Sequence, residues 1–293
     1  MANTIAGVNL AQVAEETLPH LTSCFAPLRG IVTDFSADIS SEGASVATRI
    51  PTKPTAQDLS SGYSRSDTTL TAKTITLDTF YGFVWGFNDV ERSKSSLMLN
   101  DLFITPALDA LGTKVFGDIW NLVVNANFAT SSTITAANFD RDDVVDLGTT
   151  LTDTKKAPKA GRTLWCDPQH YGALVKTLNS AEFPGITAEK AEAMVPRVAK
   201  FDVYETDLAD ANGENLAAFA FHRSSLLMAA RGVDSTGAQA AGVEVENVVI
   251  PDLNLPVQFR RWYDPDTGYL KYSVGLLYGV AVGTDMGVRV VTA

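Results

Sequence analysis

The chain has 293 residues, 45% of them hydrophobic, and its 23 Lys and Arg against 34 Asp and Glu give a formal net charge of −11 at pH 7. A chain of this kind buries a substantial core, as one large domain or two ordinary ones. The acidic surplus excludes a surface that attracts phosphate backbones broadly, so sequence-specific nucleic-acid binding is not expected.

Compartment and targeting signals are sparse. Cys24 and Cys166 form neither a disulfide framework nor a CxxC pair, which favours a reducing cytoplasm as the origin. The first basic residue is Arg29, whereas a secretory signal begins with a basic head, so export by that route is not expected. The most apolar run, "LLYGVAVG" near residue 280, is shorter than the roughly 18 to 20 residues that cross a bilayer, so no membrane span is predicted.

The first half of the chain contains a long polar stretch between two β-like runs. Residues 1–40 form a lead segment with a weak helical stripe that Pro19 is expected to end, and we interpret it as an arm. Residues 52–69 separate the runs 46–50 and 70–77 and contain few apolar side chains. Loops of this length are uncommon in compact domains and usually functional or disordered. The pattern predicts a two-stranded ribbon with a mobile tip that projects about 30 Å.

An aromatic strand, "FYGFVWGF", precedes the most regular segment of the chain, residues 99–128. Its apolar residues recur at spacings of three and four, which places them on one face of an α-helix: Ile104, Leu108, Leu111, Val115, Ile119 and Leu122. Asn100 or Asp101 could cap this helix, and Pro106 suggests that the regular part begins there.

Beyond residue 130 the pattern predicts alternating helices and strands. Helices are expected around 144–151, from 168 onward with Asp167 as N-cap and Pro168 at the first position, and near 188–194. Strands are expected at 162–166, 197–206, 216–221 and 224–230. The last forty residues predict a β hairpin, 255–263 and 269–283, joined by the turn from Asp264 to Gly268.

The residues that most often carry catalysis do not form a recognisable site. His20, His170 and His222 lie in separate segments, where surface or capping roles are favoured over metal binding. Cys166 ends an apolar strand and is expected to be a buried hydrophobe. The stretch "GVDSTGAQ" lacks the Lys and Ser or Thr of a phosphate loop. We therefore predict no catalytic residue, no cofactor and no metal.

An acidic cluster leaves one alternative open. Asp140, Asp142, Asp143 and Asp146 could bind a hard cation, although acidic residues in the first turn of a helix are the simpler interpretation. A cytoplasmic hydrolase that uses His170 and this cluster is the enzyme alternative.

The order of these parts resembles the major capsid protein of tailed bacteriophages, the Hong Kong 97 fold. The stretches "SVATRIPTKPTAQDL" and "LTAKTITLDTFYGFVWGFND" resemble its extended loop and return strand, and "LNDLFITPALDALGTKVFGDIWNLVVN" resembles its spine helix. "RTLWCDPQHYGALVKTLNS" and "FAFHRSSLLMAARGV" resemble parts of its axial domain, and "VQFRRWYDPDTGYLKYSVGLLYGVAV" resembles its peripheral hairpin.

The resemblance implies an α+β fold in five parts. These are an N-terminal arm (1–40), an extended β loop (41–79), a peripheral domain with the spine helix (80–139), a mixed α/β axial domain (140–255), and the peripheral-domain β hairpin with C-terminal strands (256–293). It also implies contacts between subunits. In the extended loop these involve Lys53, Asp58, Tyr63, Arg65 and Lys73, and at the hairpin tip, near a local threefold axis, they involve Asp264, Asp266 and Gly268.

The implied function is structural, not enzymatic. Such subunits form pentamers and hexamers of an icosahedral head around double-stranded DNA, which is assembled in the host cytoplasm. A portal, a decoration protein, and a scaffolding protein or removed scaffolding segment are the further partners implied. Some family members crosslink a loop lysine to an asparagine of a neighbour, but no motif here fixes that asparagine. An encapsulin-type compartment shell, which encloses proteins, is the alternative with the same fold.

Overall fold

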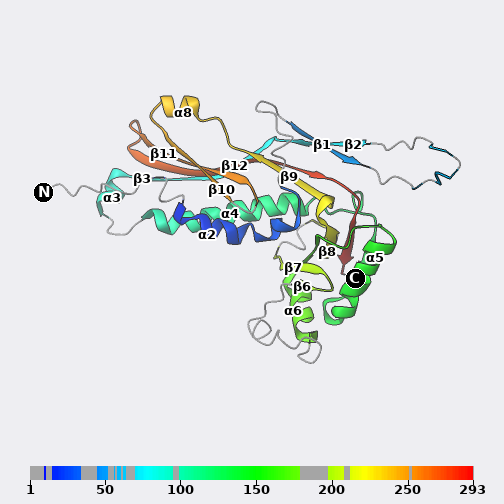
Figure 1. The fold of residues 1–293 in the computed structure, drawn as a ribbon. Helices are drawn as coiled ribbons and strands as arrows, with labels where there is room; N and C mark the ends of the chain where they lie inside the picture. Colours follow the sequence, from blue (N-terminus) through cyan, green and yellow to red (C-terminus); the bar gives the residue numbers. More distant parts are fainter. Residues whose placement is uncertain are drawn as a thin grey trace.

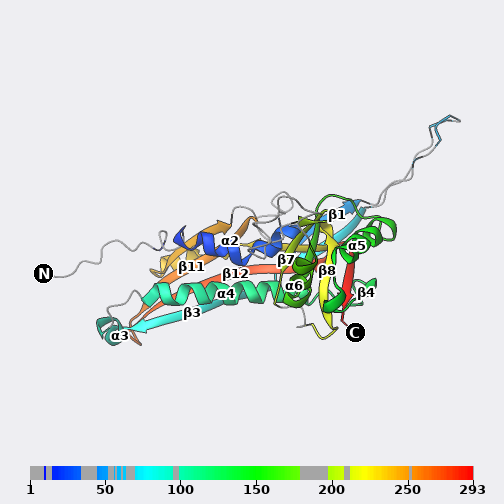
Figure 2. The ribbon, with the colours of Figure 1, turned by 90° about the horizontal axis from the view of Figure 1, so that it is seen from below.

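The computed structural model describes residues 10, 15–33, 45–51, 56, 58–60, 62–63, 70–94, 99–178, 197–207, 212–250 and 253–292. The molecule has an elongated part, built from a sheet and a long helix, and a second part at one end that contains another sheet (Figure 1). A two-stranded hairpin, β1 (Ser45–Pro51) and β2 (Leu70–Thr76), projects from the junction of the two parts (Figure 2).

The first sheet is antiparallel. Its strands run in the order β10 (Glu244–Ile250), β11 (Leu255–Asp264), β12 (Tyr269–Val282) and β3 (Thr79–Asn88). The far half of β12 also pairs with β9 (Leu226–Arg231). The long apolar hairpin of β11 and β12 organises this sheet, because each of its strands has a further strand on its outer side. The hairpin predicted around Asp264 to Gly268 is confirmed, with Asp264 opposite Tyr269.

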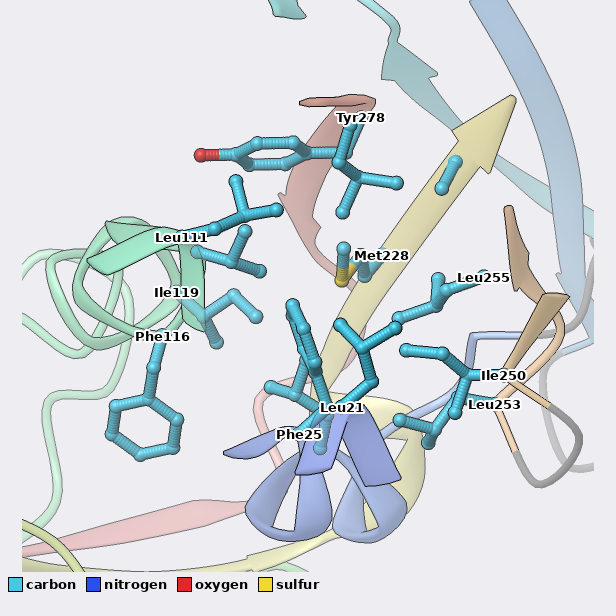
Figure 3. Close-up of a cluster of buried hydrophobic side chains, with 14 of the residues drawn as sticks. Leu21, Phe25, Leu111, Phe116, Ile119, Met228, Ile250, Leu253, Leu255 and Tyr278 are labelled. Carbon is cyan, nitrogen blue, oxygen red and sulfur yellow. The ribbon is translucent and has the colours of Figure 1, made fainter. Parts of the chain in front are cut away.

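Helix α4 (Leu99–Trp120) lies along one face of this sheet, together with α2 (Leu18–Cys24) and the 3-10 turn η1 (Ala26–Gly30). Figure 3 shows side chains from α2, α4, β9, β10 and β12 meeting in one cluster, among them Leu21, Phe25, Leu111, Ile119, Met228, Ile250 and Tyr278. Five of the six residues predicted for the apolar face of the helix, from Ile104 to Ile119, are buried in this cluster.

Two expectations for these helices are wrong. The long helix ends at Trp120 and not at Phe128, because tighter backbone bonds end it: the amides of Leu122 and Val123 donate to carbonyls only three residues back. It also begins before Pro106, which lies exposed within the helix. The helical residues Glu15 and Glu16 end at a turn at Thr17, just before Pro19, and Pro19 itself lies in the first turn of α2, where its missing amide hydrogen costs nothing.

The second sheet is mixed and has the order β4 (Ser131–Thr133), β13 (Gly287–Val291), β8 (Leu216–His222), β5 (Arg162–Cys166), β7 (Phe201–Glu205) and β6 (Arg197–Val198). Helices α5 (Arg141–Asp153) and α6 (Pro168–Thr177) belong to this part. Strands β5 and β8 are apolar on both faces. Trp165 and Phe219 face the main core, whereas Leu164 and Ala218 face a second cluster with α5 and α6, so the two parts share a continuous interior.

Local signals explain the helices of this part. The Asp140 side chain accepts hydrogen bonds from the amides of Asp142 and Asp143, and the Asp143 side chain accepts one from the amide of Asp140, which completes a capping box. Asp167 caps α6 as predicted, with Pro168 at its start. The remaining short elements are α3 (Asp89–Lys94), η2 (Ala136–Asn138), η3 (Arg223–Ser225) and α8 (Thr236–Ala240).

The sheets do not divide where the expected domain ranges do. Strands β9 and β10 precede residue 255 but belong to the first sheet, and β13 follows residue 256 but belongs to the second. Arg289 fixes β13 there: its buried guanidinium donates to the Phe128 carbonyl at 2.7 Å and to Glu214 at 2.6 Å. In the lead segment, Leu21 and Phe25 are buried in the main core, so at least this part of the expected arm lies against the body. The helix expected at 188–194 lies outside the described residues.

Candidate inter-subunit surfaces

The base of the β1–β2 hairpin is anchored to the body. Val46 and Ile75 face each other across the hairpin and are fully buried, in a small cluster with Leu77, Leu227 and Ala229. Strand β12 passes so close that a side chain at Gly279 would meet the Thr76 carbonyl oxygen at 1.9 Å. The direction in which the hairpin leaves the molecule is therefore set by packed backbone.

The outer part of the hairpin has no such support. Among the described residues it forms a sheet of two strands only, with seven paired positions from Ser45–Thr76 to Pro51–Leu70. A two-stranded hairpin is marginally stable alone in water. Leu70, at the outer end of the described pairing, is 57% exposed.

The predicted loop residues are placed unequally. Lys53 and Arg65 lie outside the described residues. Tyr63 is 92% exposed, and Asp58 is exposed with its pKa lowered by hydrogen bonds from the Ser60 side chain and amide. Lys73 is half-buried on β2, opposite Thr48. Their expected contacts with a neighbouring subunit stay a prediction.

The tip of the β11–β12 hairpin is rigidly built. Asp264 accepts hydrogen bonds from Lys271 and Thr267, both at 2.7 Å, and these contacts lower its pKa to about 2. Gly268 adopts a φ of 68°, which favours glycine, and its carbonyl accepts from the amide of Asp89 in α3. Asp266 is exposed. The tip is thus preorganised to present a fixed shape.

Strand β3 contributes a surface that the sequence analysis did not identify. It forms an edge of the first sheet and leaves four large apolar side chains between 45% and 58% exposed: Phe80, Tyr81, Phe83 and Val84. Phe80 and Val84 line a groove of about 460 Å³ together with Trp262. An exposed apolar edge strand invites association with another chain. The sequence signal for this surface is the run "FYGFVWGF", which is apolar at nearly every position. An ordinary edge strand alternates apolar and polar residues instead.

Several residues of the enzyme alternative have structural partners within the fold. His170 is fully buried, so a surface role for it is wrong: its ring bonds Asp167 at 2.7 Å and the Ile134 carbonyl at 3.1 Å. His222 caps η3 through the Ser224 amide, as a capping role predicts. Asp140 and Asp143 are engaged in the capping box of α5. Cys166 is fully buried, as predicted.

The hairpin loop and the hairpin tip lie at opposite ends of the molecule. In Figure 1 the β1–β2 hairpin extends beyond the second sheet, whereas the β11–β12 tip lies beside α3 at the far end. Within the part of the chain that the structure describes, no helix has both the length and the apolar character to span a bilayer.

Known structures of phage capsids have the same fold. The chain matches the capsid structure of cyanophage P-SCSP1u with a TM-score of 0.61 and 14% identity, over 92% of this chain and 88% of that one. It matches a structure from Mycobacterium phage Che8 with a TM-score of 0.60 and 18% identity, over 91% and 90%. A virus-like particle from Pyrococcus furiosus matches with a TM-score of 0.53 and 13% identity, over 96% and 98%.

Neither protein-family models nor curated protein sequences match the chain. The structural likeness nevertheless covers about nine tenths of both chains for the phage proteins. The class of protein is therefore defined by its fold. This chain has the α+β, Hong Kong 97-type fold of phage capsid proteins, as the sequence resemblance predicted.

Proposed function

We propose that this chain is the major capsid protein of a tailed bacteriophage. Copies of it form the pentamers and hexamers of an icosahedral head, assembled in the host cytoplasm, that encloses double-stranded DNA. The observation that carries this proposal is the projecting β1–β2 hairpin on a capsid fold, whose buried contacts among the described residues lie at its base. A hairpin that cannot stabilise itself becomes ordered by lying on an adjacent subunit.

Shell closure multiplies weak contacts. Each subunit is held by several neighbours, so the loss of one contact remains effectively intramolecular. The exposed side chains of β3 supply apolar contact area, and the hairpin extends far enough to contact an adjacent subunit. The net charge of −11 suits a container for DNA, because an acidic wall does not bind the packaged duplex through counterion release. A portal, a scaffolding protein or segment, and a decoration protein are the additional partners proposed.

Deletion of residues 52–69 tests the role of the hairpin. Pro51 and Leu70 already face each other, so an Asn-Gly turn can join them without strain. We expect a folded, soluble subunit that forms no stable shells, measured by circular dichroism, sedimentation velocity and negative-stain microscopy. The matched control replaces the same residues with a Gly/Ser segment of equal length, which keeps the length of the loop but removes its specific side chains. This variant should also form no stable shells. Normal particles from the deletion variant would contradict the proposal.

A charge reversal tests the hairpin tip, which we propose contacts neighbouring capsomers near a local threefold axis. Asp266→Lys changes an exposed side chain without removing the bonds that Asp264 accepts. We expect unchanged stability of the subunit but fewer closed particles. Asp153→Lys on α5, where the side chain is 83% exposed, is the matched charge reversal and should assemble normally at physiological salt. Equal particle yields from the two variants would exclude the tip contact.

The Pyrococcus furiosus particle supports one alternative, a shell with another cargo. The matches to cyanophage P-SCSP1u and Mycobacterium phage Che8, with TM-scores of 0.61 and 0.60, exceed the 0.53 of this particle and favour a phage head, while the structures from phages XM1 and Bobi match at the same 0.53. The contents of particles purified from the native source distinguish a phage head from a compartment shell. We expect nuclease-protected double-stranded DNA inside, whereas an interior that contains only protein would favour the compartment shell.

A further inference from the structure

Three side chains that commonly bind metal ions converge where α2 crosses α4. His20 and Cys24 lie four residues apart on α2, so both point from the same face of the helix. Asp109 lies opposite them on α4. One of its carboxylate oxygens is 2.9 Å from His20 Nε2 and 3.0 Å from Cys24 Sγ, and the three ligand atoms lie within 4.8 Å of one another.

This cluster is close to the dimensions of a metal centre. A tetrahedral zinc site with bonds of about 2.0 to 2.3 Å holds its ligand atoms about 3.3 to 3.8 Å apart. The present hydrogen-bond distances therefore need to open by less than about 1 Å, which small side-chain rotations provide. Two ligands at i and i+4 of one helix are an arrangement that also binds zinc in helical His motifs.

The surroundings favour a cation. Cys24 and Asp109 line an open cavity of about 510 Å³ whose lining also includes Glu205 and Asp207 but no Lys or Arg among the described residues. The His20 and Asp109 side chains are 36% and 56% exposed, so an ion and its water can reach them. A hydrated divalent ion therefore meets a negatively charged entrance.

We propose that His20, Cys24 and Asp109 bind a borderline divalent transition-metal ion of the Zn²⁺ class, with water in the fourth position. A neutral imidazole, a thiolate and a carboxylate together neutralise the charge of the ion, and thiolate with imidazole is the ligand set that Zn²⁺ prefers over Mg²⁺ or Ca²⁺. Binding breaks the Cys24 S–H bond and releases its proton to solvent while the metal–sulfur bond forms.

The ion replaces a hydrogen bond: without a cation, the Cys24 thiol donates to the Asp109 carboxylate at 3.0 Å. A divalent ion at the same point removes the repulsion between the thiolate and the carboxylate, and it links α2 to α4. A ligand that binds the folded state but not the unfolded state stabilises the folded state.

The test uses the full chain, treated with a chelator and titrated with Zn²⁺ or Co²⁺. We expect one Zn²⁺ per chain by calorimetry, a higher Tm with Zn²⁺, and a Co²⁺–thiolate charge-transfer band in the near ultraviolet. Cys24→Ser should abolish the band, and Asp109→Asn, which keeps a hydrogen-bond acceptor, should weaken Zn²⁺ binding roughly 100-fold or more. The matched controls His222→Gln and Asp285→Asn should bind as the parent does.

Cys24→His distinguishes the loss of a ligand from misfolding, because it keeps a metal ligand at this position. This variant should retain Zn²⁺ binding but show no Co²⁺–thiolate band. The proposal fails if the parent chain shows no saturable binding, or if the Co²⁺ band persists in Cys24→Ser. These measurements use the unassembled chain and need no assembled shell, so their outcome is independent of the proposed shell function.

Discussion

At the residue scale, His170 and His222 have pKa values that are shifted in opposite directions. For His170, burial lowers the pKa, but the bonds to Asp167 and the Ile134 carbonyl outweigh it, and the net pKa is raised. For His222, burial and the nearby Arg223 and Arg162 guanidinium groups lower the pKa. The two residues therefore affect stability in different pH windows.

Linkage gives the sign of each effect. Above about pH 6.5 the unfolded chain loses the His170 proton that the folded chain still binds, so the free energy of unfolding falls as pH rises through the folded pKa. Below about pH 6.5 the unfolded chain binds a proton at His222 that the folded chain does not, so the free energy of unfolding falls as pH falls.

Urea unfolding at about pH 5.5, 6.5 and 8.5 checks this prediction. His170→Gln should remove the decline between pH 6.5 and 8.5, and His222→Gln should reduce the decline between pH 6.5 and 5.5. Each variant is the control for the other, because the comparison uses slopes and not absolute stability. An unchanged alkaline slope in His170→Gln would show that the buried imidazole carries no proton in this range.

At the element scale, the close approach of β12 to the end of β2 determines how the hairpin is mounted. Gly279→Ala would place a methyl group 1.9 Å from the Thr76 carbonyl oxygen and 2.7 Å from its carbonyl carbon. Because both are backbone atoms, a side-chain rotation cannot relieve the clash. We expect a loss of about 1 to 3 kcal/mol or more in the free energy of unfolding, measured with urea.

Gly117→Ala is the matched control, because nothing lies within 4 Å of its added carbon in the last turn of α4. There the substitution should stabilise the chain by about 0.5 to 1 kcal/mol through helix propensity. If Gly279→Ala unfolds at the same urea concentration as the parent, the contact between β12 and β2 is not tight.

Elements with local signals were predictable from the sequence. Asp140, Asp167 and Pro168 fix the starts of α5 and α6 through bonds within three residues, and the long hairpin follows from apolar strands around a turn. Strand β10 was not foreseen, and the C-terminal strands were expected with the hairpin, whereas β13 joins the second sheet. Strand β13 pairs with β4 and β8, both more than 60 residues away, so nothing in its own sequence specifies the sheet that it joins.

At the scale of the whole molecule, the candidate surfaces were predictable in part. The polar stretch 52–69 indicated a projecting loop because it lacks residues that could return to a core. The exposed side chains of β3 were not foreseen, since apolar residues on both faces ordinarily indicate a strand covered on both sides. Among the described residues nothing covers these side chains fully, and self-association supplies the cover in the proposed shell.

The same proposal predicts how salt affects assembly. Each copy has a formal net charge of −11, so approaching copies repel one another over the Debye length, about 30 Å at 0.01 M salt but about 8 Å at 0.15 M. Contacts through Phe80, Val84 and the hairpin are short-ranged and mainly apolar, so salt weakens them little. Screening should therefore lower the protein concentration at which shells form.

Light scattering and sedimentation of purified subunits across this salt range measure that threshold, with sucrose at matched osmolality as the control for excluded solute. A threshold that falls with KCl but not equally with sucrose supports assembly limited by like-charge repulsion. Shells that dissociate as KCl increases would show instead that ion pairs between copies dominate the interface, and the apolar edge of β3 would then lose the role argued for it.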